Sequence, residues 1–306
     1  MARFPLLPMR TAFILLLAAL GVIDPSAAPA SPATFVTALP VAKNQGLFRF
    51  NAEPGFGPSG YRSLQFPVNF AYGGTPSWSL FVTANQGVLS LDHNPSTFGA
   101  GNALVFIRNT LFKIDKPRST FRVAPLAGAS LPTGQNRYTV DGTLAPGPLQ
   151  AGSGTVDPYA GVTFGYNNSL FGAAWDATYL DNRAASAGYS PGSQLDADGQ
   201  MEIRLLPFHL PDEGLPSSLV LSIEGNYQDQ GTSHVNRLPI QASANKTYKQ
   251  DAIFEWATLH WEAGAGEQLS VMRDYETPHP IAARSRTYLF FEYYVSMPGW
   301  RRRGLR

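Results

Sequence analysis

Apolar and polar residues alternate along many segments of this chain. Between Leu64 and Tyr72 every even position is apolar and most odd positions are polar or small. Phe171, Trp175 and Tyr179 likewise share one face of a run whose other face carries polar or small residues. A period of two is typical of strands with two different faces. We count about twelve such runs after residue 44, which predicts an all-β fold.

The connectors between these runs alternate between short and long. The short connectors are residues 73–77, 114–118, 167–168 and 264–266. The long polar connectors are residues 86–101, 131–155, 181–199, 229–250 and 277–284. Outer-membrane barrels have short periplasmic turns and long extracellular loops. The spacing therefore predicts a transmembrane, antiparallel, up-and-down β-barrel of about 12 strands.

Strand length and aromatic placement favour this barrel over a soluble exported β-protein, which is the alternative fold. The runs span roughly 9–12 residues, as a tilted membrane-crossing strand requires, whereas soluble strands most often have about 5–6. Aromatic residues gather towards the strand ends, where membrane barrels carry aromatic girdles. These residues are Tyr61, Tyr72, Trp78, Tyr166, Tyr179, Tyr227, Trp256 and Trp261.

The two ends of the chain differ from the rest in composition. Residues 1–30 have a basic start, an apolar stretch over 11–23 and a small-residue site at Ala28-Pro29-Ala30, which predicts a secretory signal peptide. An uncleaved anchor is the alternative. Residues 31–44 are either a periplasmic lead-in or a plug inside the barrel, which would occupy residues 45–297. Residues 298–306 form a basic tail. The predicted location is the cell outer membrane.

Composition narrows the possible functions. Of 306 residues, 44% are hydrophobic and 15% charged, against about a quarter in average proteins. The net charge of +1 gives no reason to expect a nucleic-acid partner, and the absence of cysteine excludes thiol chemistry. The histidines lack metal-ligand spacing; they are His93, His209, His234, His260 and His279. We expect no catalytic residue, metal or cofactor, and therefore no enzyme.

The polar faces of the strands supply candidates for the lining of the lumen. They are Arg49, Asn51, Glu53, Gln65, Asn69, Asp176, Glu202, Arg204, Glu224, Asn226, Gln228, Glu255 and Glu292. Because charges inside a barrel must be paired or hydrated, we expect Arg204 and Glu224 to pair across adjacent strands. About twelve strands would enclose a narrow pore for small solutes.

Three short motifs occur in order along the chain. Leu131-Pro132-Thr133-Gly134 follows one strand, Gly152-Ser153-Gly154 and Asp157-Pro158-Tyr159 lead into the next, and Glu224 lies in a later apolar run. This order resembles the outer-membrane barrel family associated with the meta-pathway of phenol degradation. The resemblance implies a porin-like transporter for hydrophobic or aromatic compounds, and it implies no particular site residues.

The expected function is passage of small molecules through the lumen, with outer-membrane lipid and a small solute as partners. The alternative is a non-conducting outer-membrane barrel whose long loops bind a ligand or partner. The oligomeric state stays open.

Overall fold

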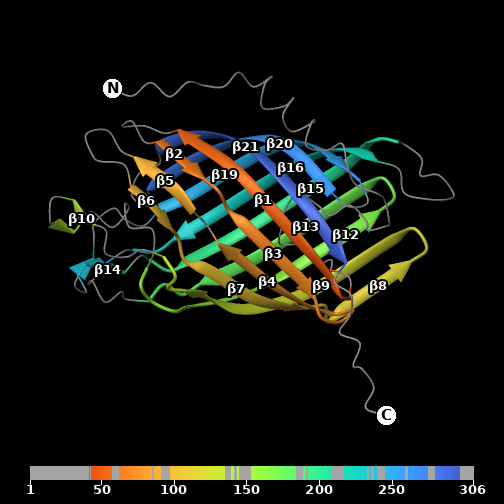
Figure 1. Cartoon of the computed structure of the whole chain (residues 1–306), viewed down its shortest axis with the longest axis horizontal. Coiled ribbons are helices and arrows are strands. Elements are labelled where there is room, and N and C mark those ends of the chain that lie inside the picture. The colour runs from red at the N-terminus through yellow and green to blue at the C-terminus, as the bar shows by residue number, and fades with distance from the viewer. Residues whose placement is uncertain are drawn as a thin grey trace, which may run out of the picture.

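Twelve antiparallel strands form a closed ring in the computed structural model (Figure 1). The model describes residues 41, 43–56, 62–84, 86–90, 97–134, 139–140, 143–144, 153–183, 189–190, 192–207, 217–232, 234–235, 238–239, 245–258, 261–274 and 280–296. The ring strands are β1 (Gln45–Phe56), β3 (Val68–Gly73), β4 (Trp78–Ala84), β7 (Ala103–Asn109), β9 (Ser119–Leu131), β12 (Asp157–Asn168), β13 (Phe171–Leu180), β15 (Gln194–Leu206), β16 (Ser218–Gln230), β19 (Asn245–Ala257), β20 (Trp261–Asp274) and β21 (Pro280–Ser296).

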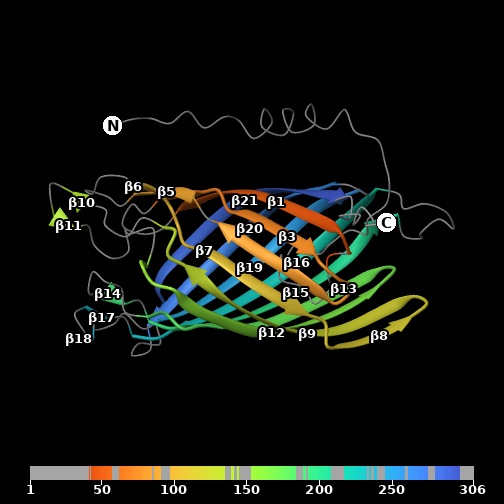
Figure 2. The same ribbon diagram turned by 60° about the horizontal axis from the view of Figure 1, so that its bottom comes forward.

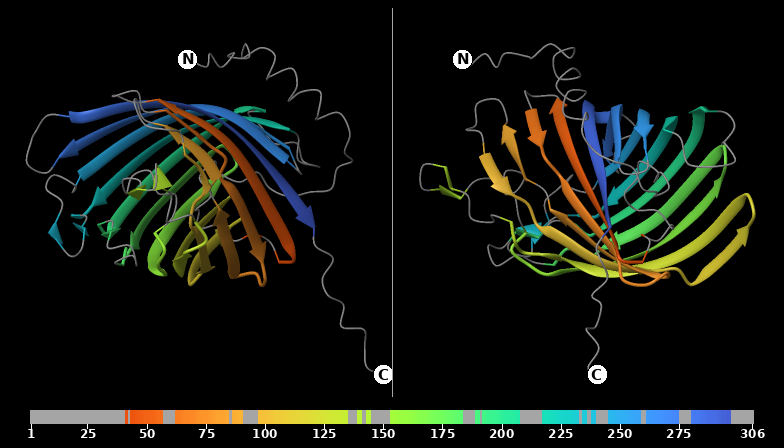
Figure 3. Two further views of the ribbon diagram at one scale, coloured as in Figure 1. Left: turned by 60° about the vertical axis from the view of Figure 1, so that its left-hand side comes forward. Right: turned by 45° about the vertical axis from the view of Figure 1, so that its right-hand side comes forward.

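Each ring strand pairs with its neighbour, and β21 pairs with β1 from Gln45↔Ser296 to Phe56↔Ser285. This last pairing closes the ring, so neither β1 nor β21 is left as an open edge. Two further views show the strands tilted and curving around a common interior (Figure 3).

The two faces of the ring are the reverse of those in a soluble protein. On β16, Ile223 is 59% exposed on the outward face, whereas its neighbour Ser222 is fully buried. On β19, Phe254 is 57% exposed and Glu255 only 1%. Apolar side chains thus cover the outside and polar ones the inside, as lipid on the outer surface requires. The prediction of a transmembrane antiparallel barrel of about 12 strands is confirmed.

Short turns join the strands at one end of the ring, called here the short-turn end. Thr75 Oγ1 accepts a hydrogen bond from the Trp78 amide at 3.0 Å, and Thr258 Oγ1 does so from Trp261 at 3.1 Å. Asn168 Oδ1 accepts from the Phe171 amide at 2.8 Å. Such side chains satisfy turn backbone locally. The ring begins and ends here, because Gln45 pairs with Ser296.

The opposite end carries the longer connections and is called the long-loop end. It holds two small sheets, seen at the left of Figure 2. One joins β10 (Thr139–Val140) to β11 (Thr143–Leu144). The other joins β14 (Tyr189–Ser190), β17 (His234–Val235) and β18 (Leu238–Pro239). Since β14 and β17 belong to different connections, two of the predicted loops are tied to each other.

Four further strands extend the sheet beyond the ring. β2 (Arg62–Gln65), β5 (Gln86–Ser90) and β6 (Thr97–Ala100) continue it from β1. They show that the predicted connector 86–101 contains strand structure. β8 (Phe112–Lys116) pairs with β9 and projects at the short-turn end, with all five residues exposed (Figure 2). The predicted single run from Leu64 to Tyr72 is divided at Pro67, whose nitrogen cannot donate to the ladder.

Two predicted turns are misplaced. Residues 114–116 of the predicted turn 114–118 lie inside β8, so this turn is only residues 117–118. Residues 264–266 lie inside β20, where Gly264 pairs with Glu255, and the true turn follows Ala257. The Gly-Ala-Gly composition looked like a turn, but the turn chemistry comes from Thr258. Three long connectors are also shorter than predicted: β15 begins at Gln194, β16 ends at Gln230, β19 begins at Asn245, and β21 begins at Pro280.

The ring strands span Gln45–Ser296. The predicted signal peptide (1–30), most of the lead-in (31–44) and the basic tail (298–306) lie outside the described residues. Within the described part of the chain, no helix has the length and hydropathy needed to cross a membrane.

Candidate functional site

One side of the lumen is filled by an apolar cluster near the short-turn end. The apolar cluster consists of Leu47, Ala71, Phe81, Phe106 and Leu126, on the inward faces of β1, β3, β4, β7 and β9. The Phe81 and Phe106 rings are stacked, with centroids 4.8 Å apart and an interplanar angle of 4°. Their exposures are 1% and 2%, so they pack against other side chains and do not line open water. This side of the lumen is a packed core.

Two arginines lie on the same side of the lumen. The Arg108 guanidinium carbon lies 4.4 Å from the centroid of the Phe81 ring, a cation–π contact. Arg49, on β1, is 4% exposed and lies within electrostatic range of Glu224 and Glu262. The two arginines therefore place positive charge on the apolar side of the lumen, and Arg49 lies close enough to interact with the glutamates of the acidic side.

The chain just before β1 also enters the lumen. The Val41 amide donates to Ser79 Oγ at 3.1 Å, and Ser79 is an inward-facing residue of β4. Val41 packs against the apolar cluster. The Asn44 amide donates to the Gly73 carbonyl at 2.7 Å, and Asn44 has a φ of 61°, which turns the chain into β1. Val41 thus narrows the short-turn end.

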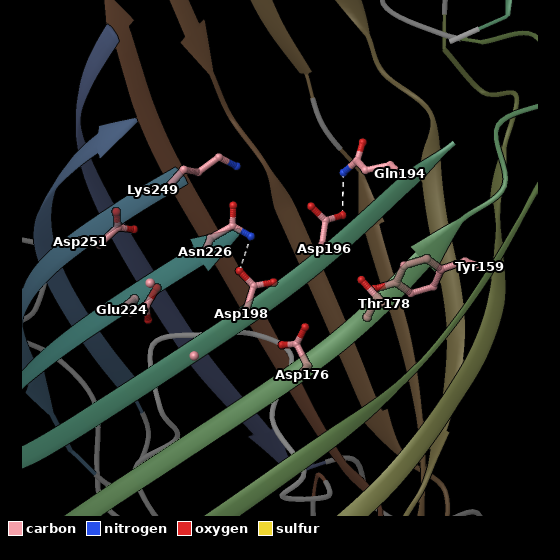
Figure 4. Close-up of a pocket in the computed structure, with 12 residues that line it drawn as sticks. Tyr159, Asp176, Thr178, Gln194, Asp196, Asp198, Glu224, Asn226, Lys249 and Asp251 are labelled. Carbon is pink, nitrogen blue, oxygen red and sulfur yellow. Dashed lines mark hydrogen bonds between the residues drawn. The ribbon is translucent and has the colours of Figure 1, made fainter. Parts of the chain in front are cut away.

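The other side of the lumen holds a cavity of about 340 Å³, called here the acidic cavity. Figure 4 shows its side chains pointing into the barrel from neighbouring strands. Its lining is Tyr159, Asp176, Thr178, Gln194, Asp196, Asp198, Gly199, Glu224, Gly225, Asn226, Lys249 and Asp251. Five of these residues are acidic and one, Lys249, is basic.

Hydrogen bonds fix part of this lining. Gln194 Nε2 donates to Asp196 Oδ2 at 2.6 Å, and Asn226 Nδ2 donates to Asp198 Oδ1. Two acceptor atoms, Glu224 Oε1 and Asn226 Oδ1, are buried and accept no hydrogen bond from the described residues. A buried acceptor without a donor is energetically unfavourable. The cavity thus has hydrogen-bonding capacity that the described residues do not use.

A second acidic group lies nearer the short-turn end. Glu255 and Glu262 are each 1% exposed, and Ser222 Oγ donates to Glu255 Oε1 at 2.5 Å. Glu202 lies within electrostatic range of Glu255. The inward faces of β13 to β20 therefore form a continuous acidic wall, opposed by the two arginines of the apolar side.

The structure places nine predicted lumen residues on inward strand faces. They are Arg49, Asn69, Asp176, Glu202, Arg204, Glu224, Asn226, Gln228 and Glu255. The structure does not describe the side chains of the other four candidates, which are Asn51, Glu53, Gln65 and Glu292. Their backbones are placed by strand pairing: Glu53 lies opposite Gln65, Asn51 opposite Phe290, and Glu292 opposite Arg49.

The predicted pair of Arg204 with Glu224 is wrong. Arg204 lies opposite Val220, and Glu224 lies opposite Gln200. Arg204 instead donates to the Ser169 carbonyl at the short-turn end. The register separates the two charges by four positions along β16, which alternation alone does not reveal.

Sequence reasoning named only three of the twelve residues that line the acidic cavity, Asp176, Glu224 and Asn226. Asp196 and Asp198 fell in a predicted loop, as did Lys249, although all three lie in strands. The alternation of Gln194, Asp196, Asp198 and Gln200 was a usable signal, because it continues the period of the strand that follows. Residues 194–200 are mostly polar or small, and this composition is also typical of a loop.

Residues Thr133, Ser153 and Asp157 of the sequence motifs brace the long-loop end. Asp157 is 1% exposed and accepts hydrogen bonds from Ser153 Oγ at 2.9 Å, Thr155 Oγ1 at 2.8 Å and the Arg183 amide at 2.9 Å. Thr133 Oγ1 accepts from the Ala103 amide at 2.8 Å. The motifs therefore hold the long connection against its neighbours and position Tyr159 at the cavity.

This geometry defines the class: the fold is that of an outer-membrane β-barrel. Among solved structures, the chain is similar to the COG4313 outer membrane channel from Pseudomonas putida F1, with a TM-score of 0.56, 13% identity, and coverage of 87% of this chain and 100% of that one. It is also similar to the KdgM porin in complex with disordered oligogalacturonate, with a TM-score of 0.41, 8% identity, and coverage of 80% and 98%. No family model matches the chain, and no curated protein matches it.

Proposed function

We propose that this protein is an outer-membrane channel for small molecules. The observation that carries the proposal is the closed ring with a polar, partly hollow interior and an apolar exterior. Solutes would pass along the acidic wall, beside the packed apolar cluster. No chemical step is needed.

The resemblance to the phenol-degradation family implies hydrophobic or aromatic solutes, and the charge of the lining refines that implication. An acidic wall lowers the local concentration of anions and raises that of cations. Neutral and cationic solutes therefore fit the lumen better than aromatic acids.

The test uses the full chain expressed in a Gram-negative host and purified from its outer membrane. We expect the protein to resist carbonate extraction and to give discrete current steps in a planar lipid bilayer. Release by carbonate would contradict the membrane location. Insertion without current steps would contradict the channel.

The alternative of a non-conducting, ligand-binding barrel has one observation in its favour. Phe81, Phe106 and Val41 fill part of the lumen at the short-turn end. In that case the protein would insert, remain silent in the bilayer, and bind its ligand from the long-loop side.

A further inference from the structure

We infer that the acidic cavity binds small organic ammonium cations that carry an aromatic or apolar group. The inference deepens the proposed channel function, on which its meaning for transport rests. Three independent features of the cavity support it: its charge, its unused hydrogen-bond acceptors, and the aromatic ring at its edge.

The charge of the lining favours a cation. Asp176 lies within electrostatic range of Asp196, Asp198 and Glu224, and Glu224 lies within range of Asp251. Carboxylates this close repel one another, strongly so where burial lowers the dielectric constant, and they relieve the repulsion by taking up protons or a cation. Lys249 offsets only part of this charge. A bound cation relieves the remaining repulsion, whereas an anion adds to it.

The hydrogen-bonding capacity favours a donor-rich cation. Glu224 Oε1 and Asn226 Oδ1 both belong to cavity-lining residues, and both are buried acceptors without a donor among the described residues. A primary ammonium group has three N–H donors and no acceptor. It can therefore satisfy both atoms and contribute charge at the same position.

The aromatic edge favours an apolar group on the ligand. Tyr159 lines the cavity, and its ring centroid lies 5.5 Å from that of Phe106 in the apolar cluster. Phe106 and Phe81 are buried behind Tyr159, so the Tyr159 ring is the aromatic face that the cavity presents to a ligand. A cation attached to a ring can contact carboxylates and aromatic faces together.

The first experiment compares three probes of similar shape on the unmodified protein in detergent micelles. Benzylammonium carries a positive charge, benzyl alcohol none, and benzoate a negative charge. Isothermal titration should show benzylammonium binding at least about tenfold more tightly than benzyl alcohol, and no binding of benzoate. Methylammonium should bind more weakly than benzylammonium. Equal binding of benzylammonium and benzyl alcohol, or tight binding of benzoate, would overturn the inference.

The second experiment compares two glutamates on the acidic wall. Glu224→Gln removes a charge from the cavity lining, whereas Glu202→Gln removes one outside it. We expect Glu224→Gln to weaken benzylammonium binding by about tenfold and Glu202→Gln by much less. Equal losses would show that only the general charge of the lumen matters. If either variant fails to fold, the probe series on the unmodified protein still decides.

Bilayer recordings separate the two proposals. Current steps with a K⁺-selective reversal potential and block by benzylammonium support both. A Cl⁻-selective reversal potential contradicts the cation site but leaves the channel standing. Binding of benzylammonium by a protein that gives no current contradicts the channel and retains the site.

Discussion

The apolar cluster and the acidic cavity share one lumen, but their side chains are satisfied in different ways. Phe81 and Phe106 stack on one another, Arg108 lies over the Phe81 ring, and both phenylalanines have almost no exposed surface. The cavity side chains surround about 340 Å³ of space, and no described residue donates to Glu224 Oε1 or Asn226 Oδ1. Packed apolar side chains therefore fill one side of the lumen. On the other side, polar side chains line a cavity that can hold a ligand.

The difference follows from which residues occupy the inward positions. β4 and β7 place phenylalanines there, whereas β13, β15 and β16 place Asp176, Asp198 and Glu224 there. Apolar rings gain free energy by excluding water, but clustered carboxylates need water or a cation. We expect substitutions on the two sides to act on different properties: stability on one and selectivity on the other.

The largest expected effect on stability is that of Phe106→Ala. Removing a fully packed ring leaves a cavity and should lower the free energy of unfolding by about 3–5 kcal/mol. It should also raise the unitary conductance, because the ring fills the lumen. Urea unfolding from lipid vesicles and bilayer recording measure the two effects.

Phe254→Ala is the matched control, since Phe254 faces outward on β19 and is 57% exposed. Lipid chains can fill the space left there, so the loss should be smaller and the conductance unchanged. If the two variants lose equal stability, the apolar cluster is not a packed core.

A smaller effect is expected for Ser222→Ala on the acidic wall. The change removes the 2.5 Å hydrogen bond to Glu255 and leaves a buried acceptor unsatisfied, which should cost about 1–3 kcal/mol. Cation selectivity should persist, because the charge of the wall is kept. A loss of selectivity without a loss of stability in the same unfolding and reversal-potential measurements would reverse the roles assigned to the two sides.

The smallest effect is expected outside the lumen, at the β8–β9 hairpin. A hydrogen bond from Thr120 Oγ1 to Asp115 Oδ1 at 2.6 Å lowers the pKa of Asp115, and Arg122 lowers it further. The charged form is thus favoured in the folded hairpin, so this stabilisation is present above the ordinary pKa and lost as pH falls through the lowered one.

Thr120→Val should therefore raise the Asp115 pKa towards its ordinary value, which carboxyl NMR in a pH titration can follow. Lys113→Ala should shift it less, because Lys113 makes the weakest of these contributions. Ion selectivity should be unchanged in both variants, since this hairpin projects from the ring. A change in selectivity would mean that charge outside the lumen also governs permeation.

The alternation of side chains determined the all-β fold, the approximate strand number and the inward polar face. These properties follow from the backbone of each strand, because successive side chains point to opposite faces wherever the strand lies. Arg49, Asp176 and Glu224 could therefore be predicted as lining residues one strand at a time. Turn positions were less predictable, as residues 264–266 show, because glycine and alanine are also tolerated inside strands.

Only the tertiary structure decided which inward residues meet. Register places Gln200 opposite Glu224 and moves Arg204 to the short-turn end, and closure of β21 onto β1 brings Arg49 within range of Glu224 and Glu262. These contacts depend on the stagger and tilt of the whole ring, which no single strand encodes. The sequence alone thus determined the composition of the lumen, and ring geometry divided it into a packed side and an acidic cavity.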